Sequence, residues 1–255
     1  MSCAMLMDWR FRPIRPTSGL GILTLIFLVL VGCSDSSDNR VNQVADQFSY
    51  SVLTSTTGNG LDLLDELSNS VLPELESEGA EEYAIWSRAP DPQNDFEEIA
   101  EDRLVVMLRW EDVKIQQLSD VLQGLSNVSE VSTTLWEVSL RGGEGPIQTG
   151  SGFYIHRFNR YLSEDVDEVL SLSEEAWVTW EPYWGAVVPG VWQELDPVDN
   201  VNGITRLMRI AWYRDMEHWM ETRQFWKEPE SFQLFIERGA LHLDDESWSA
   251  DLAPD

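Results

Sequence analysis

Cysteine is nearly absent from this 255-residue chain, and its two copies, Cys3 and Cys33, both lie near the N-terminus. No disulfide can therefore cross-link the body of the protein, whose stability must come from packing. The body also has no cysteine to serve as a nucleophile, and no Gly-x-Ser-x-Gly elbow occurs. These absences argue against a disulfide-framework domain and against hydrolases that use a catalytic cysteine or a nucleophile elbow.

Positive charge is also scarce. Lysine occurs only at positions 114 and 227, and 17 basic residues face 45 acidic ones, which gives a formal net charge of −28. Such a surface repels phosphate backbones, so no nucleic-acid partner is expected. A solvated, salt-adapted surface is a simpler interpretation of the acids than a dedicated role in binding cations.

The chain has few histidines, at positions 156, 218 and 242, and none has a cysteine or histidine partner at metal-ligand spacing. No metal site and no cofactor are therefore predicted. The glycine-rich stretch 141–152 lacks both the lysine of a P-loop and the spacing of a dinucleotide fingerprint. It is interpreted as a linker.

The N-terminus has the charge and hydropathy pattern of an export signal. Three arginines between residues 10 and 15 precede an apolar run over 20–32, shorter than the ~20 residues that a membrane-spanning helix needs. The run leads into Leu30-Val-Gly-Cys33, which resembles the lipobox of bacterial lipoproteins. The resemblance implies removal of residues 1–32 and lipidation of Cys33. A non-cleaved anchor or an ordinary secretory signal is the alternative.

The residues after Cys33 predict where the body is held. By the same resemblance, Ser34 implies sorting to the outer membrane of a Gram-negative cell, with the body facing the periplasm. Residues 33–46 are polar and predict a tether. The expected membrane partner is thus a bilayer, reached through the N-terminal lipid.

Twelve tryptophans and nine phenylalanines indicate a packed body, and their spacing indicates that one unit occurs twice. Trp86 and Trp192 lie 106 residues apart, and Trp110 and Trp212 lie 102 apart. Hydrophobic periodicity predicts the order β-α-β-β-α-β in residues 47–140 and again in 153–255, with a short final strand over 247–252. The predicted fold class is α+β, with two ferredoxin-like units in tandem.

The second unit resembles the NIPSNAP family and the related antibiotic-biosynthesis-monooxygenase-like domains. The matches are Tyr154-x-x-Arg157, the helical segment Val166 to Leu170, the strand around Trp192, and an acidic helix start after Trp212. The resemblance implies a dimeric α/β barrel in which two sheets face one another across a cavity. With both units in one chain, a monomer can complete this barrel. Family activities include cofactor-free oxygenation of polycyclic aromatics and oxidative haem breakdown.

Polar residues on the predicted strands are the candidate ligand-binding groups. They are Arg103, Arg109, Arg157, Asn159 and Arg209. Aligning Trp110 with Trp212 places the arginines of the two central strands on one face, opposite the tryptophans, and this face is expected to look into the cavity. Guanidinium groups there favour a small anionic, carboxylate-bearing or aromatic ligand. Internal pairing with the many acids of this chain is the simpler alternative.

Two histidines are weaker candidates. His156 lies on the first strand of the second unit, where a histidine satisfied by its neighbours is more usual than a catalytic base. His218 lies on the helix after Trp212 and suits a haem contact by position. The haem-degrading relatives carry their histidine later on that helix, where this chain has none over 225–230, so haem is not expected.

Two classes of function remain open. A membrane-anchored module that binds a small molecule or a partner is favoured, and a cofactor-independent monooxygenase acting on an aromatic or anionic molecule is the alternative. A polar cavity with a clear mouth would favour a small-molecule site. A barrel filled by side chains, with an exposed apolar patch outside, would favour an interaction module.

Overall fold

The computed structural model describes residues 47–89, 97–111, 115–142, 147, 150–195 and 202–253. The export signal over 1–32, the lipidation site Cys33 and the tether over 33–46 lie outside the described residues. Within the described segments, no helix is both long and apolar enough to cross a membrane.

The first unit begins with strand β1 (Gln47–Ser55) and continues through a helical segment, two long strands and a second helix. Its further elements are η1 (Gly60–Leu63), α1 (Leu64–Glu66), η2 (Leu67–Val71), α2 (Leu72–Ser77), β2 (Ala80–Arg88), the short β3 (Glu97–Glu98), β4 (Arg103–Trp110), α3 (Ile115–Gln123) and β5 (Val128–Arg141). Asn59 caps the helical segment, because its side chain accepts a hydrogen bond from the Leu61 backbone N–H. The segment ends before Gly79, whose φ of 96° lies in the left-handed region that favours glycine.

The second unit repeats this order with longer helices. Its elements are β6 (Phe153–Leu162), η3 (Ser163–Asp165), α4 (Val166–Trp184), β7 (Val187–Glu194), β8 (Ile204–Tyr213), α6 (Met216–Thr222), η4 (Phe225–Lys227), α7 (Pro229–Gly239) and β9 (Asp244–Leu252). Asp215 caps α6 by accepting from the His218 backbone N–H at 2.7 Å. The final strand β9 begins three residues earlier than the predicted start at 247.

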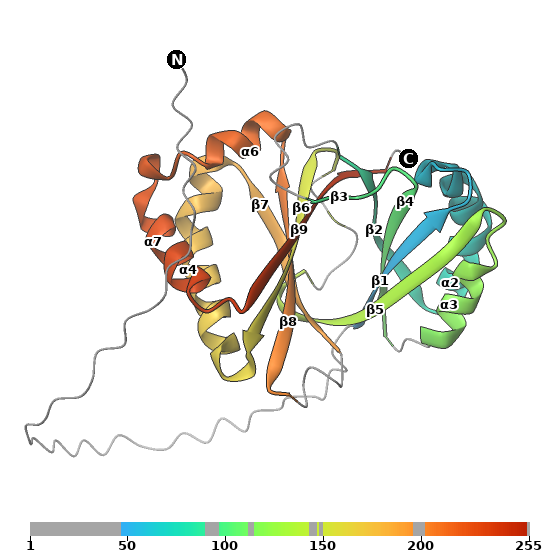
Figure 1. The fold of residues 1–255 in the computed structure, drawn as a ribbon, viewed down its shortest axis with the longest axis horizontal. Coiled ribbons are helices and arrows are strands. Elements are labelled where there is room, and N and C mark those ends of the chain that lie inside the picture. Colours follow the sequence, from blue (N-terminus) through green and yellow to red (C-terminus); the bar gives the residue numbers. More distant parts are fainter. Residues whose placement is uncertain are drawn as a thin grey trace, which may run out of the picture. The chain divides into compact units, whose positions relative to one another are not determined.

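The two four-stranded sheets join at both of their edges. Among the described residues, the strand order is β2-β4-β1-β5-β7-β8-β6-β9-β3, in which the short β3 pairs in parallel with β9. Because β2 also pairs with β9, the eight long strands close into a ring. The joints β5–β7 and β2–β9 are both antiparallel. Figure 1 shows α2 and α3 outside the first sheet, and α4 and α7 outside the second. The predicted α+β class, with tandem ferredoxin-like units that build the barrel within one chain, is confirmed.

The interior of this barrel is a hydrophobic core, which corrects the expectation of a cavity between the sheets. Both units contribute buried aromatic side chains to it. They include Phe48, Tyr50, Tyr83, Trp86, Trp136, Tyr154, Phe158 and Trp192. Among the described residues, these rings fill the middle of the space between the sheets.

The core shows the twofold repetition of the chain. Phe48 packs edge-on against Trp192, with ring centroids 5.8 Å apart, and Trp86 packs in the same way against Tyr154 at 6.0 Å. Each contact is the repeat of the other, because 48 to 154 and 86 to 192 are both steps of 106 residues. The same step relates Tyr50 to His156, and a hydrogen bond of 2.8 Å joins these two side chains.

The third strands of the two units, β4 and β8, turn their tryptophans to opposite sides, which corrects the alignment of Trp110 with Trp212. Trp110 packs under the helices of the first unit, whereas Trp212 packs against the barrel core. Trp110 pairs with Gln47 and Tyr213 with Phe153, so Tyr213 is the structural equivalent of Trp110. An alignment one residue out of register moves a whole strand to the other face. The arginines of β4 and the candidate arginine of β8 therefore lie on different faces.

His156 predicts how the stability of the barrel depends on pH. Burial lowers the pKa of His156 from 6.5 to about 3. Between these values the unfolded chain binds a proton that the folded chain does not, so stability falls as the pH drops below 6.5. His156→Gln keeps a hydrogen-bonding partner for Tyr50 and should remove up to roughly 3 kcal/mol of the stability loss between pH 7 and 4. Denaturant unfolding across this pH range measures the effect.

The matched control is Tyr50→Phe, which removes the hydrogen bond but leaves the imidazole in place. This variant should retain the acid sensitivity of the wild type. An equal acid slope in His156→Gln and the wild type would contradict the assignment to this histidine.

Candidate functional site

The arginine candidates of the first unit do not form a site. Arg109 pairs with Glu81 on the neighbouring strand, with 2.7 Å between Nη1 and Oε2. Arg103 lies exposed at the other end of β4. As predicted, both share the strand face of Val105 and Met107, which belong to the barrel core. They sit at the ends of the strand, apart from the candidates of the second unit.

Arg157 and Arg209 lie on the outer face of the second sheet, which corrects their expected orientation toward the barrel interior. Their neighbours along the two strands, Ile155 and Ala211, belong to the core between this sheet and its helices. The two arginines are direct partners in the β6–β8 register. Residues that face each other in this way have Cβ atoms about 5 Å apart, and like charges there repel.

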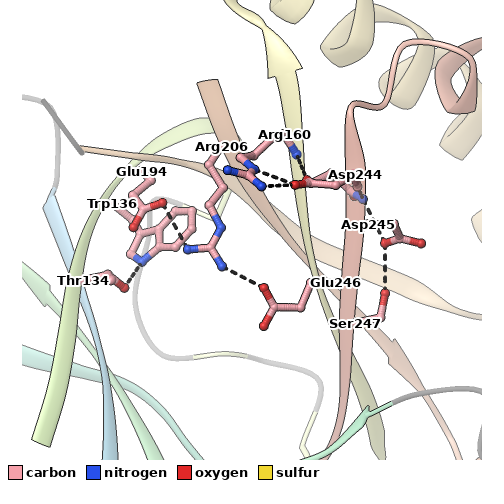
Figure 2. Close-up of polar contacts among 10 residues, drawn as sticks. Thr134, Trp136, Arg160, Glu194, Arg206, Asp244, Asp245, Glu246 and Ser247 are labelled. Atoms are coloured by element: carbon pink, nitrogen blue, oxygen red, sulfur yellow. Dashed lines mark hydrogen bonds and ion pairs between the residues drawn. The ribbon is translucent and has the colours of Figure 1, made fainter. Parts of the chain in front are cut away.

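One carboxylate on β9 partly balances these charges. The Asp245 side chain lies 3.7 Å from the Arg157 guanidinium and accepts from Asn159 at 2.9 Å. Ser247 donates to the same carboxylate at 3.1 Å, a contact drawn in Figure 2. Although burial opposes its charged form, Arg157 and these two hydrogen bonds hold the pKa of Asp245 below its usual value. The candidate Asn159 thus positions the counter-charge of Arg157.

A third arginine, Arg238 on α7, joins the group and was missed in the sequence. Its side chain is 8% exposed, donates to Ser173 on α4 at 3.1 Å, and lies 4.9 Å from the centre of the Phe235 ring. Its buried Nε has no hydrogen-bond partner in the described structure. Burial and the charge of Arg209 lower the pKa of Arg238 well below its ordinary value. We refer to Arg157, Arg209 and Arg238 as the arginine cluster.

Arg209 is the least compensated member of the arginine cluster that can be reached from solvent. It is partly exposed, and in the described residues no acid forms an ion pair with it. Burial lowers the pKa of Arg209, repulsion from Arg157 lowers it further, and Tyr161, Tyr213 and Asp245 act in the other direction. At Arg238 the phenols of Tyr161 and Tyr213 act in the other direction, against burial and the charges of Arg209 and Arg157. Arg209 and Arg238 thus lie near one carboxylate, Asp245, which already contacts Arg157.

His242 and Tyr161 border the arginine cluster. Their rings meet edge-on with centroids 5.1 Å apart, and the His242 Nε2 atom is buried without a partner among the described residues. Burial, together with the charges of Arg209 and Arg238, lowers the pKa of His242 to about 4. Burial raises the pKa of Tyr161. Both side chains are therefore neutral near pH 7, and neither adds a counter-charge.

The two histidine candidates have structural positions. His156 is buried in the barrel core beside Tyr50. His218 accepts from the Arg214 backbone N–H at Nδ1 (3.0 Å) and bonds the Trp184 carbonyl oxygen through Nε2 (2.6 Å). Since both of its ring nitrogens are occupied, His218 links the end of α4 to the start of α6. In the part of the chain that the structure describes, no three histidine, cysteine or acidic side chains gather as a metal site would require.

A pocket of about 340 Å³ opens at one end of the barrel, above Phe158. Here the arginines are paired: Arg206 lies 3.2 Å from Glu194 and 3.1 Å from Glu246, and Arg160 pairs with Asp244 (Figure 2). Internal ion pairing, the simpler alternative for the arginine candidates, is thus found at the barrel mouth as well as at Arg109 and Arg157. The barrel mouth and the arginine cluster contrast in charge: acids outnumber cations at the first, and cations outnumber acids at the second.

Comparison with known proteins places the fold but not the activity. No family model matches the sequence, and no curated protein matches it. Among solved structures, a candidate monooxygenase from Fusobacterium nucleatum subsp. nucleatum is 10% identical with a TM-score of 0.50, and covers 82% of this chain and 92% of its own. An anthrone oxidase-like protein is 11% identical with the same score and coverage. A chlorite dismutase variant from Candidatus Nitrospira defluvii is 10% identical with a TM-score of 0.50, covering 82% and 91%.

These likenesses define the class of fold, a dimeric α/β barrel of the kind found in monooxygenase-like and chlorite dismutase-like proteins. Sequence identities this low support a conclusion about the fold alone. The chemistry of this chain has to be argued from its own side chains.

The imbalance of charge predicts opposite effects of two arginine substitutions. Arg209→Met removes a guanidinium that has no acid partner in the described residues, so stability should hold or rise by about 1 kcal/mol. Arg206→Met removes the cation that pairs with both Glu194 and Glu246 at the barrel mouth, and should cost about 1–3 kcal/mol. Urea unfolding of both variants at pH 7 measures the difference. Equal destabilisation by the two would show that Arg209 has a structural partner.

Proposed function

We propose that this protein is a lipid-anchored binding module, and that its arginine cluster holds a small anionic ligand. The observation that carries the proposal is that Arg209 and Arg238 have no acid partner among the described residues. A buried charge without a partner costs several kcal/mol, so a fold keeps one where a ligand supplies the missing charge. Guanidinium groups bind carboxylates through paired, charge-assisted hydrogen bonds, which favours a carboxylate-bearing ligand.

The surroundings of the cluster favour a ligand with an aromatic body. Phe235 lies beside Arg238, and Trp180 packs edge-on against Phe235 with centroids 5.9 Å apart. Trp180 and Tyr213 lie in the same core, 6.1 Å apart. An aromatic carboxylate would match apolar contacts on one side and arginines on the other.

Binding should be visible in tryptophan fluorescence because Trp180 is close to the cluster. The purified full-length protein should respond to aromatic carboxylates such as benzoate, and Arg209→Met should weaken binding roughly tenfold, as expected for one lost charge-assisted contact of ~1.4 kcal/mol or more. Arg206→Met, at the barrel mouth, is the matched control and should bind as the wild type does. Absence of binding to every member of an aromatic-carboxylate panel would refute the proposal.

An interaction module is the other form of this function. A barrel filled by side chains favours an interaction module. Several large apolar side chains are also exposed, among them Val178 (67%), Tyr183 (52%) and Trp226 (75%). The charge imbalance at the arginine cluster favours the small-molecule form. A protein partner would be the better reading if no small anion binds.

The lipobox carries the proposal that the module sits on the periplasmic side of the outer membrane. Cys33→Ala should abolish acylation and leave a precursor that is not trimmed at residue 32. Cys3→Ala, which changes the other cysteine of the chain, should be acylated normally. Metabolic labelling with palmitate measures both, and wild-type labelling of Cys33→Ala would rule out lipidation at this site.

Cofactor-independent oxygenation is the second candidate, favoured by the likeness to a candidate monooxygenase and an anthrone oxidase-like protein. The neutral His242 at the edge of the cluster offers an imidazole that can accept a proton from a bound ring hydroxyl. Oxygen uptake with the ligands that bind distinguishes the two candidates: none is expected of a binding module. Both candidates fit a monomer, since the ring of strands closes within one chain.

A further inference from the structure

We infer that the ligand of the arginine cluster is a dianion, such as an aromatic dicarboxylate, whose two acidic groups take the places of two missing counter-charges. This inference rests on the proposed binding function and names the charge class of the ligand. It follows from the charges that the fold assembles between the second sheet and its helices.

Four charged side chains from four elements define the balance. Arg157 comes from β6, Arg209 from β8, Arg238 from α7 and Asp245 from β9. Asp245 lies 3.7 Å from Arg157 and accepts a hydrogen bond from Asn159, so its negative charge compensates Arg157 on the β6–β9 side of the cluster. Two of the three cations remain, and the net charge of the described cluster is +2.

Among the described residues that border the cluster, Tyr161, His242 and Ser173 supply no negative charge at neutral pH. Burial and a nearby carboxylate keep the Tyr161 phenol protonated in spite of the arginines. His242 is neutral and carries no negative charge in any state. Ser173, the partner of Arg238, contributes a neutral hydroxyl whose own hydrogen is donated to the Val169 carbonyl. A monoanion would therefore leave one guanidinium uncompensated.

The positions of the two cations also suit two acidic groups. Arg209 projects from the outer face of the second sheet, whereas Arg238 reaches the cluster from α7, which packs on α4 outside that sheet. A single carboxylate binds one guanidinium in a paired geometry. A ligand with two carboxylates can engage the sheet side and the helix side of the cluster at the same time, and Phe235, whose ring centre lies 4.9 Å from Arg238, offers an apolar contact for a ring between them.

A pair of probes that differ by one carboxylate tests the inference. Titration calorimetry at pH 7.5 on the purified full-length protein should show isophthalate binding at least roughly tenfold more tightly than benzoate, the factor expected for one further charge-assisted contact. In Arg238→Met this preference should fall to about twofold or less. In Arg209→Lys, which keeps the charge, the preference should persist, and Arg206→Met should behave as the wild type.

The possible outcomes separate the inference from the function on which it rests. If benzoate and isophthalate bind equally, the dianion inference is overturned and the anion-binding function stands. If neither binds, the proposed function itself fails. Should Arg238→Met not fold, Arg209→Met provides the same comparison, because it removes the other uncompensated cation. A preference for isophthalate that survives in every folded arginine variant would show that the second charge is recognised elsewhere.

Discussion

The pairing of β5 with β7 and of β2 with β9 is the constraint on which the rest of this structure depends. A lone ferredoxin-like sheet has two open edges and one face that needs cover. Here each unit closes the edges of the other, and the two inner faces bury one another. The apolar side chains of both inner faces then have to fill the barrel, which the repeated contacts Phe48–Trp192 and Trp86–Tyr154 do. Tyr50 and His156 meet between them as the polar exception.

A filled barrel restricts where charged groups can do chemical work. They can lie in one of two places: at the barrel ends, where water reaches them, or between a sheet and its helices. Arg206 takes the first place and is held by two acids. Arg209 takes the second and is opposed by Arg157 across the strand pair. Since the same residue type occurs in both environments, the supply of counter-charge, and not the presence of arginine, distinguishes a structural group from a candidate binding group.

Much of the fold was predictable because tryptophan spacing and hydrophobic periodicity repeat along the chain. The orientation of Arg209 was not, and the reason is physical. β8 is buried on both faces, so its pattern has no polar side to fix the register, and the bulky Trp212 was matched to Trp110 where Tyr213 is the equivalent. Arg157 and Arg209 were therefore chosen correctly as neighbours but placed on the wrong face. Arg238 lies in the last turn of a helix, where a cation commonly offsets the helix dipole in solvent. Its position in the sequence therefore gave no sign that it is buried.

The acidity of the chain bears on how an anion could reach the cluster. A formal net charge of −28 opposes the approach of an anion, but at physiological ionic strength this repulsion is screened beyond ~8 Å. Inside that range the half-buried guanidinium groups dominate, because their field is not weakened by water to the same degree. For the proposed anionic ligand, the surface would thus affect mainly the rate of association, and the arginine cluster would determine affinity and selectivity. A site of this kind would discriminate among ligands by their local charge and shape, against a background that repels anions in general.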